Sequence, residues 1–389
     1  MRILNVTSVF PPAWAYGGPV TVIYKVAAGL QQLGHTVMTL TTNLGCGGEL
    51  TARPGEETLW KETPVVYYPV RRGVPFYSPK LRRGLRQRVS SCDLLLVNGN
   101  WTYVNWACRI EAAAANLPYI LYTHGVFDPW AIAHHGLRKK IWWQMAEREN
   151  YRRAAAIIAQ TQAEIGQVRA MGVTTRIEVI PNGVDPHDFD DFESREALEQ
   201  RFPALKDRRS VLFLGRLHRK KGLEELVPCF RDVLQKHPDV LLVLAGPDDR
   251  GYRQEVETLV RHNNLTSSVL FTGLVSGATK AGLLRAAGVF VLPSYSEGLP
   301  LGVLEAMACA RPVVITPYCN LSEVAEAGAG LSVEPEPKAL ASAISRLLDD
   351  DKGRAEMGAI GLRLVQERFT WEKVARMTEA LCLDILSKR

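Results

Sequence analysis

Two carboxylates are the residues of this chain whose type and spacing first suggest chemistry. Glu297 and Glu305 are the only acidic residues of the stretch SEGLPLGVLEAMACARPVV. The apolar run after Pro300 predicts a helix over 301–310, which places Glu305 on the same face as Leu301. A buried carboxylate needs hydrogen-bond donors, and sugar hydroxyls are such donors. Glu297 precedes the helix, where it could either hold a ligand or act as a first-turn acid.

A basic loop is the second candidate. GRLHRKKG follows the apolar strand VLFL and leads into the next predicted helix. A strand end that runs into a helix N-terminus favours anions through both charge and the helix dipole. Arg216 and Lys221, near the two ends of this loop, are therefore predicted to grip a diphosphate. Arg219 and Lys220 between them are interpreted as surface residues with no assigned role.

Two further loops carry weaker signals. Gly17 and Gly18 precede a predicted helix, and their missing Cβ atoms would let a phosphate approach the free backbone N–H groups. The alternative is a glycine turn that serves only geometry, since neither GxGxxG nor a P-loop occurs. His124 follows the predicted strand 119–123, and both a structural and a functional role are open for it.

The elements that must position these residues alternate between strands and helices. Strands are predicted at 3–9, 36–42, 65–70, 94–98, 119–123, 155–159 and 177–180, and again at 211–214, 240–245, 269–272, 289–292 and 313–315. This alternation predicts an α/β protein with doubly wound parallel sheets, whose ligands bind at the carboxyl ends of the strands. The turn-rich segment PNGVDP separates two domains, 1–183 and 184–370, expected to face each other across a cleft. The segment 371–389 reads as one more amphipathic helix.

Composition limits the compartment and the partners. The seven cysteines are scattered without a CxxC pair, and no 18 apolar residues run together, which favours a cytoplasmic protein without a disulfide framework. The net charge is uneven: residues 1–185 hold 20 Lys+Arg and 12 Asp+Glu, the remainder 27 and 29. The basic surplus lies at Arg71-Arg72, at 80–88 and at 138–140. It is either a solvated surface or a patch for an anionic membrane, at the inner face of the plasma membrane, or for a phosphate-bearing acceptor. Nucleic acid is not indicated.

No metal site is predicted. His134 and His135 are adjacent, so on a helix they would point apart. The pair Asp188 and Asp190 forms a DxD pattern, but it lies past the linker rather than directly after a core strand.

Taken together, these motifs resemble the retaining GT-B fold glycosyltransferases of family 4. The likeness runs along nearly the whole chain, through the Gly17-Gly18 loop, PNGVD, GRLHRKKG and above all the two glutamates of SEGLPLGVLEAMACARPVV. The family fold has two Rossmann-like domains. The resemblance implies that the final helix crosses back to the first domain.

The resemblance also implies roles for individual residues. Arg216 and Lys221 would hold the donor diphosphate with help from Gly18, Glu305 would bind the nucleotide ribose, and Glu297 would hold the donor sugar. His124 would lie near the reacting sugar. The remaining donor-binding positions would contact the sugar and phosphate (Gly298, Leu299, Pro300, Leu301) or the base (Gly246, Pro247, Leu274, Val275).

The expected activity is metal-independent, retaining transfer of a hexose from a UDP-sugar, with UDP-glucose favoured, to a saccharide or lipid-linked acceptor in polysaccharide biosynthesis. No cofactor is expected beyond the nucleotide-sugar co-substrate. A GDP-mannose-dependent mannosyltransferase and a GT-B sugar-nucleotide epimerase are the alternatives. A phosphorylase-like enzyme and a non-catalytic nucleotide-sugar-binding protein are further rivals.

Overall fold

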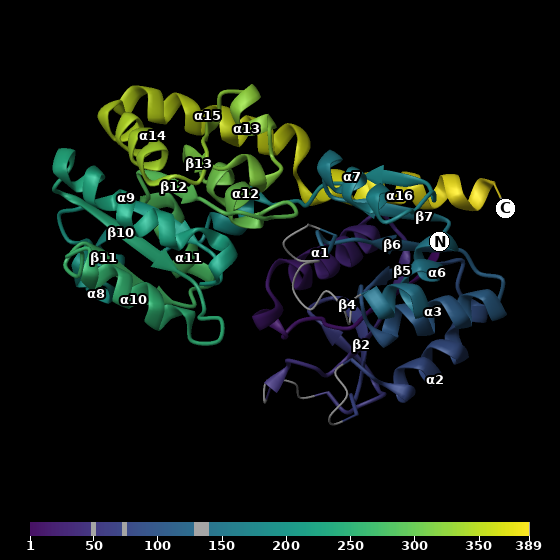
Figure 1. Ribbon diagram of the computed structural model, residues 1–389. Coiled ribbons are helices and arrows are strands. Elements are labelled where there is room, and N and C mark those ends of the chain that lie inside the picture. Colours follow the sequence, from purple (N-terminus) through teal and green to yellow (C-terminus); the bar gives the residue numbers. More distant parts are fainter. Residues whose placement is uncertain (48–51, 72–75, 128–139, 389) are drawn as a thin grey trace. The chain divides into compact units, whose positions relative to one another are not determined.

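The computed structural model describes residues 1–47, 52–71, 76–127 and 140–388. The chain divides into two compact units: Met1–Asn182 together with Trp371–Arg389, and Gly183–Thr370. We call them the N-terminal and C-terminal units (Figure 1). Of the residues singled out above, Arg72, His134, His135, Arg138 and Lys139 lie outside the described residues.

The described residues of the N-terminal unit form an eight-stranded sheet of order β3-β4-β2-β1-β5-β6-β7-β8. Its strands are β1 (Arg2–Thr7), β2 (Thr36–Thr42), β3 (Glu57–Trp60), β4 (Thr63–Tyr68), β5 (Leu94–Asn98), β6 (Tyr119–Tyr122), β7 (Ala156–Ala159) and β8 (Ile177–Val179). All neighbours are parallel except β3 and β4. β3 was not predicted from the sequence.

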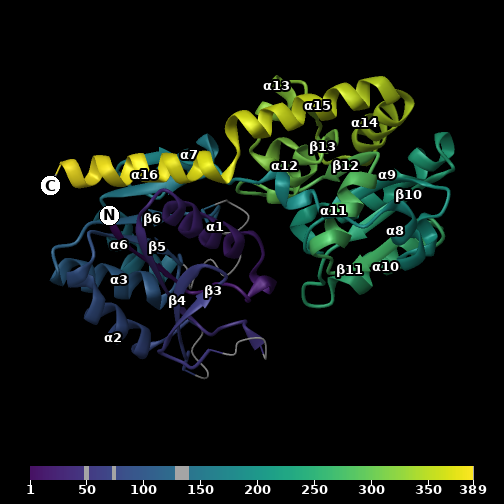
Figure 2. The same ribbon diagram turned by 180° about the vertical axis from the view of Figure 1, so that it is seen from behind.

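Helices cover both faces of this sheet, which is why its central strands are apolar on both sides. The helices are α1 (Gly18–Gln32), α2 (Pro79–Arg88), α3 (Tyr103–Ala114), α6 (Arg148–Arg152), α7 (Gln162–Ala170) and α16 (Trp371–Ser387), with a π-helical turn at Trp143–Glu147. α2 packs on α3, and α16 packs on α1 (Figures 1 and 2). A Cβ on Gly29 would lie 2.7 Å from the Cβ of Ala375, so a glycine is what lets α1 and α16 approach so closely.

The described residues of the C-terminal unit form a six-stranded parallel sheet of order β11-β10-β9-β12-β13-β14. The strands are β9 (Arg209–Leu214), β10 (Val240–Ala245), β11 (Val269–Gly273), β12 (Val289–Leu292), β13 (Val313–Ile315) and β14 (Gly330–Ser332). The last, with the sequence GLS, was also missed by the sequence reading. A parallel sheet places the carboxyl ends of its strands at one edge. The basic loop (residues 215–222) and the loop with Glu297 both lie at this edge.

The helices of this unit are α8 (Arg195–Arg201), α9 (Leu223–Lys236), α10 (Tyr252–His262), α11 (Gly277–Ala286), α12 (Leu301–Ala308), α13 (Glu323–Glu326), α14 (Pro337–Asp349) and α15 (Asp351–Arg368). α9 shows why they form: Leu223, Leu226, Val227, Phe230 and Val233 recur at helical spacing, and all are buried against the core.

The two ends of the C-terminal unit lie next to each other. The backbone N–H of Val184 donates to the carbonyl of Phe369 at 2.7 Å, and Val184 forms a parallel bridge with Thr370. The chain therefore leaves this unit close to the point where it entered, and it continues directly into α16.

Candidate functional site

Three glycines shape the carboxyl edge of the C-terminal sheet. Gly215, Gly246 and Gly273 stand at the ends of the neighbouring strands β9, β10 and β11, and the N–H of Gly246 donates to the carbonyl of Gly273 at 2.8 Å. Gly246 has φ +145°, and a Cβ there would lie 1.9 Å from the carbonyl oxygen of Gly215. A larger residue at Gly246 would separate these strand ends. Because these positions have no side chains, a ligand can approach the backbone at this edge.

The basic loop is folded onto the loop that follows β12. Residues Arg219–Lys221 form one 3-10 turn, and the ring of His218 accepts a hydrogen bond from the N–H of Lys220 at 3.1 Å. Gly222 then takes φ +69°, and a Cβ there would lie 2.0 Å from the carbonyl oxygen of Pro293. This close approach is what brings the end of the basic loop to Glu297.

Lys221 and Glu297 form a buried ion pair. The Lys221 Nζ lies 2.6 Å from the Glu297 Oε1, which also accepts a hydrogen bond from the Ser294 hydroxyl at 2.6 Å. Lys220 is the second cation, with its Nζ 4.0 Å from Oε2. Burial opposes ionisation of Glu297, but the charges of the two lysines, together with the hydrogen bonds from Lys221 and Ser294, outweigh it and hold the pKa of Glu297 below its usual value. Glu297 is therefore an anion at neutral pH.

The contact with Lys220 was not anticipated from the sequence. We interpreted this lysine as a surface residue, yet its side chain is only 24% exposed and points toward the same carboxylate as Lys221. Sequence reasoning had no means of finding this, because two consecutive lysines in a loop do not show which of them faces inward.

The backbone of Glu297 is fixed as well as its carboxylate. Its N–H donates to the carbonyl of Tyr318 at 3.0 Å, and its carbonyl accepts from the side-chain amide of Asn320 at 2.6 Å. Neither partner was predicted. The helix α12 begins at Leu301, and Pro300 is its N-cap. Pro300 therefore lies one position before the helix and not inside its first turn.

The three positions between Glu297 and α12, together with the first residue of the helix, connect the ion pair to α12. Gly298 is half-buried, Leu299 and Pro300 are buried, and Leu301 is half-buried as the first residue of α12. The N-terminus of α12 thus lies directly after the Lys221–Glu297 pair in the chain, and helix N-termini attract anions.

Glu305 is the fifth residue of α12 and is paired with a lysine that the sequence reading missed. The Lys280 Nζ, on α11, lies 2.9 Å from the Glu305 Oε1. The same Nζ lies 5.6 Å from the ring centroid of Phe189, a buried residue. We expected sugar hydroxyls as the donors to Glu305; the structure without ligand supplies an ammonium group instead.

The DxD pattern is engaged in local contacts. Asp190 binds His187 at 2.9 Å and Arg285 at 3.2 Å. The middle residue of the pattern, Phe189, belongs to the core of the C-terminal unit. These contacts agree with a structural use of the segment.

Arg216 is the most exposed charge of the predicted site. Its side chain is 42% exposed, and its Nη1 lies 3.7 Å from the Oδ2 of Asp249. The ring of His218 lies 3.5 Å from the same carboxylate. Burial lowers the pKa of His218, although Asp249 acts in the opposite direction. Asp249 was not predicted from the sequence. It lies four residues after the carboxyl end of β10, which is next to the carboxyl end of β9 in a parallel sheet, and this position could have indicated it.

The positions expected near a base lie beside this group. Gly246 and Pro247 follow β10, and Leu274 and Val275 follow β11. Leu274 is 69% exposed, while Val275 packs partly against the core. An exposed leucine at a strand end offers an apolar surface to a planar ring, and the role of these four residues stays a prediction.

In the N-terminal unit, the glycine loop stands at the start of α1. A 3-10 turn at Trp14–Tyr16 leads to Gly17, which has φ +76° and is the N-cap of α1. Both Gly17 and Gly18 are exposed, and a Cβ on Gly17 would meet nothing within 4 Å. The positive φ thus explains Gly17 by geometry alone, and phosphate binding there remains a prediction.

His124 is held as a neutral imidazole. Its backbone is left-handed with φ +52°, and its ring stacks on Tyr122 with centroids 5.4 Å apart. Its Nε2 donates to the Asn98 Oδ1 at 2.9 Å, and the Gln160 amide is 3.5 Å from its Nδ1. Burial lowers the pKa of His124 to about 4, so the ring is uncharged at neutral pH. Its three partners were not predicted.

The two parallel-sheet units define the class of the protein as GT-B. Sucrose-phosphate synthase from Thermosynechococcus elongatus superposes with a TM-score of 0.82 at 23% identity over 100% of both chains. Anabaena HepE in complex with UDP-glucose superposes with a TM-score of 0.78 at 20% identity, again over 100% of both chains. At these identities the similarity establishes the fold.

The sequence comparisons give the family. Residues 194–363 match the model of glycosyl transferases group 1, and residues 16–188 match that of glycosyltransferase family 4. The chain belongs to glycosyltransferase family 4.

Curated relatives agree with this assignment. The putative teichuronic acid biosynthesis glycosyltransferase TuaC of Bacillus subtilis is 26% identical over 97% of this chain and 96% of that protein. D-inositol 3-phosphate glycosyltransferase of Kineococcus radiotolerans is 31% identical over 60% of this chain and 58% of its own length. An uncharacterised glycosyltransferase of Methanocaldococcus jannaschii is 31% identical over 52% of this chain, a match that spans 53% of that protein.

Proposed function

We propose that this protein transfers a hexose from a UDP-sugar, UDP-glucose foremost, to a saccharide or lipid-linked saccharide acceptor in polysaccharide or glycoconjugate biosynthesis. The observation that carries the proposal is the buried pair of Lys221 and Glu297, fixed immediately before the N-terminus of α12. Support for the nucleotide comes from HepE, which was solved with UDP and with UDP-glucose.

The chemistry follows from the charges on this edge. A nucleoside diphosphate leaving group gains negative charge as the glycosidic bond breaks, and groups already in place stabilise it without reorganisation. Arg216, Lys221 and the start of α12 are the groups that would do so. A donor would also offer hydroxyls to Glu297, and a diphosphate would compete with Glu297 for Lys221. The pair thus keeps both binding groups charged and oriented until the donor arrives.

Glu305 would accept hydrogen bonds from the ribose hydroxyls. Among the described residues, Lys280 bonds one oxygen of Glu305, so the second oxygen remains able to accept. Binding of a ribose at this point would therefore not require the ion pair to break.

We infer a retaining reaction in which the acceptor attacks from the face that the diphosphate leaves. Glu297 is the acid paired with Lys221, one of the residues proposed to hold the diphosphate, and its carboxylate is already engaged by Lys221 and Ser294. A carboxylate held in this way is a poor covalent nucleophile. The departing phosphate would then take the acceptor's proton, and no metal is required.

Donor turnover tests the proposal. The full-length protein is incubated with UDP-glucose or GDP-mannose, and free nucleoside diphosphate and free hexose are measured over time. We expect UDP-glucose to be consumed faster, and Arg216→Ala and Glu297→Gln each to slow its consumption by about 10²- to 10³-fold.

A matched control comes from the same loop. Arg219 is exposed and paired with Glu224 and Glu255, so Arg219→Gln removes one positive charge without touching the proposed donor site. Its turnover should stay within about twofold of wild type, because distant surface charges are screened by salt. Equal losses in Arg216→Ala and Arg219→Gln would contradict the site. Release of an isomerised nucleotide sugar, with no free diphosphate, would indicate an epimerase.

A further inference from the structure

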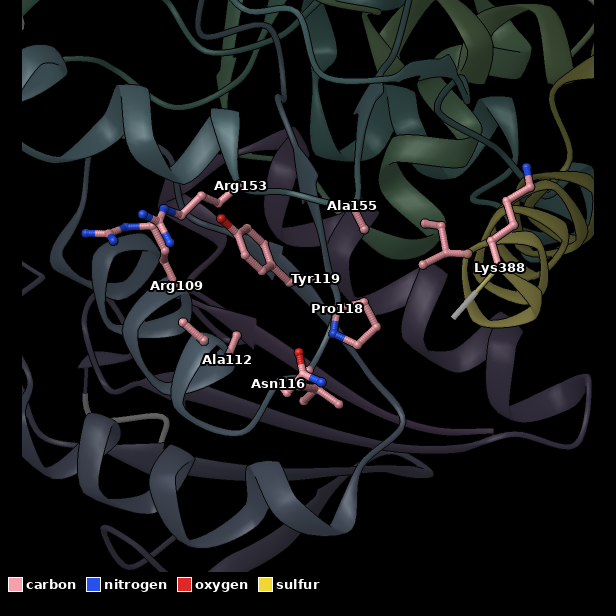
Figure 3. Close-up of a pocket in the computed structure, with 11 residues that line it drawn as sticks. Arg109, Ala112, Asn116, Pro118, Tyr119, Arg153, Ala155 and Lys388 are labelled. Carbon is pink, nitrogen blue, oxygen red and sulfur yellow. The ribbon is translucent and has the colours of Figure 1, made fainter.

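A cavity lies in the N-terminal unit. It has a volume of about 480 Å³ and is bordered by the end of α3, the segments that enter β6 and β7, and the C-terminal end of α16 with Lys388 (Figure 3). Pro118 precedes β6 and Ala155 precedes β7, so the cavity stands at the amino ends of these strands. Its size is that of a small-molecule pocket.

Positive charge dominates one side of this cavity. Arg109 and Arg153 lie together there, with the hydroxyl end of Tyr119 directed toward them, and Lys388 lies across the cavity (Figure 3). Burial raises the pKa of the Tyr119 hydroxyl, and the charges of both arginines oppose that rise. Both guanidinium groups lie on the same side of the cavity as the Tyr119 hydroxyl (Figure 3).

The two arginines are anchored through one nitrogen each. The Nε of Arg109 donates to the Asn150 Oδ1 at 2.9 Å, and the Nε of Arg153 donates to the Glu149 Oε2 at 3.0 Å. Among the described residues, the terminal nitrogens of both guanidinium groups have no hydrogen-bond partner. This arrangement fixes the side chains and leaves the terminal nitrogens of each guanidinium group available. Two such nitrogens can bind two oxygens of a phosphate or carboxylate at once.

The neighbouring acids do not neutralise these cations. Glu149 is shared between Arg152 and Arg153. Asp384 is likewise shared between Arg176 and Lys388. Among the described residues, Arg109 has no carboxylate within ion-pair distance. The cavity therefore keeps a positive surplus.

Apart from Asn116, the remaining side chains of the cavity wall are apolar. They are Ala112, Ala113, Leu117, Pro118, Ala155 and Ile385. A fully hydrated inorganic ion would leave this surface in contact with water. A ligand with an anionic end and a less polar body would use both parts of the wall.

We propose that this cavity binds a phosphate group carried on a partly apolar molecule, through the guanidinium forks of Arg109 and Arg153. The cavity stands at the amino ends of β6 and β7, whereas His124 follows the carboxyl end of β6, so its occupant is an effector or an anchor rather than a reactant. Because Ile385 belongs to α16 and Lys388 directly follows it, the bound ligand would also tie this helix to the amino ends of β6 and β7.

The first test is binding of inorganic phosphate to the full-length protein, measured by titration calorimetry. Arg109→Gln/Arg153→Gln should weaken the binding at this site at least tenfold, since it removes both forks. Lys80→Gln/Arg83→Gln removes the same charge from the exposed face of α2 and should leave the binding unchanged. Thermal unfolding of each variant shows whether it is folded. Arg153→Lys keeps the charge but not the fork, and should fall between wild type and the double variant.

The donor edge could also bind phosphate, and one variant separates the two sites. If Lys221→Ala abolishes phosphate binding while Arg109→Gln/Arg153→Gln does not, the proposal is overturned. It is equally overturned if neither variant changes the binding.

A second arm distinguishes a lipid phosphate from a soluble one. The protein is sedimented with vesicles of phosphatidylcholine and phosphatidylglycerol, and hydrogen exchange is followed over α16. Co-sedimentation that depends on Arg109 and Arg153 supports a lipid headgroup. Slower exchange in α16 with inorganic phosphate alone, lost in the double variant, supports a soluble ligand. If neither of these two effects is observed, the proposed site is wrong.

Discussion

The basic loop of the C-terminal unit and the basic helix α2 of the N-terminal unit look alike in sequence, yet their cations have different surroundings. In α2, Arg82 and Arg86 both bind the carboxylate of Glu111, a side chain that is only 3% exposed. In the basic loop, Lys221 binds Glu297 at a strand end that borders a helix N-terminus. Both acids are buried, but Glu111 lies within α3, and both of its oxygens are bound by arginines of α2.

The difference shows that a run of charged residues in the sequence does not by itself reveal whether those residues form a binding site. In α2 the pairing holds two helices together. In the basic loop the topology adds an open sheet edge and a helix dipole to the same kind of pairing. Removing each pair in turn tests whether this distinction is real.

The largest effect is expected from Lys221→Ala. The charge that stabilises the leaving diphosphate is lost, and transfer or donor hydrolysis should fall by about 10²- to 10³-fold. Initial rates with UDP-glucose measure it. The double variant Lys221→Ala/Glu297→Gln should be little worse than either single variant, because the two residues act as a unit. Losses that multiply would show that the two residues act independently.

A smaller effect, on stability alone, is expected from Glu111→Gln. Hydrogen bonds from Arg86 and Arg82 hold the pKa of Glu111 below its usual value. Losing these charged hydrogen bonds should lower the free energy of unfolding by about 2 to 3 kcal/mol, with unchanged donor turnover. Urea unfolding measures it.

The pH dependence of that stability has a definite sign. Because the folded-state pKa of Glu111 is depressed, its contribution is complete above the unfolded pKa of about 4.3 and disappears as the pH falls through the folded value. The difference between wild type and Glu111→Gln should therefore shrink on acidification. A difference that grows instead would contradict the assignment.

The smallest effect concerns membrane contact, which stays a prediction. Lys80 and Arg83 are the exposed cations of α2 that have no carboxylate partner among the described residues. Lys80→Gln/Arg83→Gln should weaken binding to vesicles that contain phosphatidylglycerol by about tenfold at low salt. The pair Arg82→Gln/Arg86→Gln should have less effect, since Glu111 already neutralises part of its charge. A failure of the wild type to co-sediment would end the membrane hypothesis.

Much of the sheet structure could be predicted because parallel strands are buried on both faces and read as apolar runs. Val240–Ala245 and Val289–Leu292 have the predicted bounds. The strand ETLW of β3 could not be found in this way, because it is a half-exposed edge strand with polar alternation. GLS of β14 is too short to show any period. The structure carries no helix, among the residues it describes, with the length and apolarity needed to span a bilayer.

The site was predictable where one loop holds several chemical groups, and not where partners come from distant segments. Arg216, Lys221 and Glu297 stand out because they follow apolar strands. Lys280 does not, since a single charge in a helix is the rule on any surface, and Asp249 is hard to distinguish from its charged neighbours Asp248 and Arg250. Only the folded chain shows that each faces a residue of the site. Asn98 is likewise a strand residue whose link to His124 depends on the pairing of β5 with β6.

The adjacency of Val184 and Phe369 has a consequence for how the protein assembles. Residues 183–370 separate α16 from the rest of the unit it completes, and a flexible connection of that length would impose a closure entropy of roughly 4 to 5 kcal/mol. Once those residues have folded, their two ends are neighbours, and most of that penalty is gone before the final helix docks onto Gly29. Partial unfolding of residues 183–370 should therefore loosen α16, although α16 is not part of that segment.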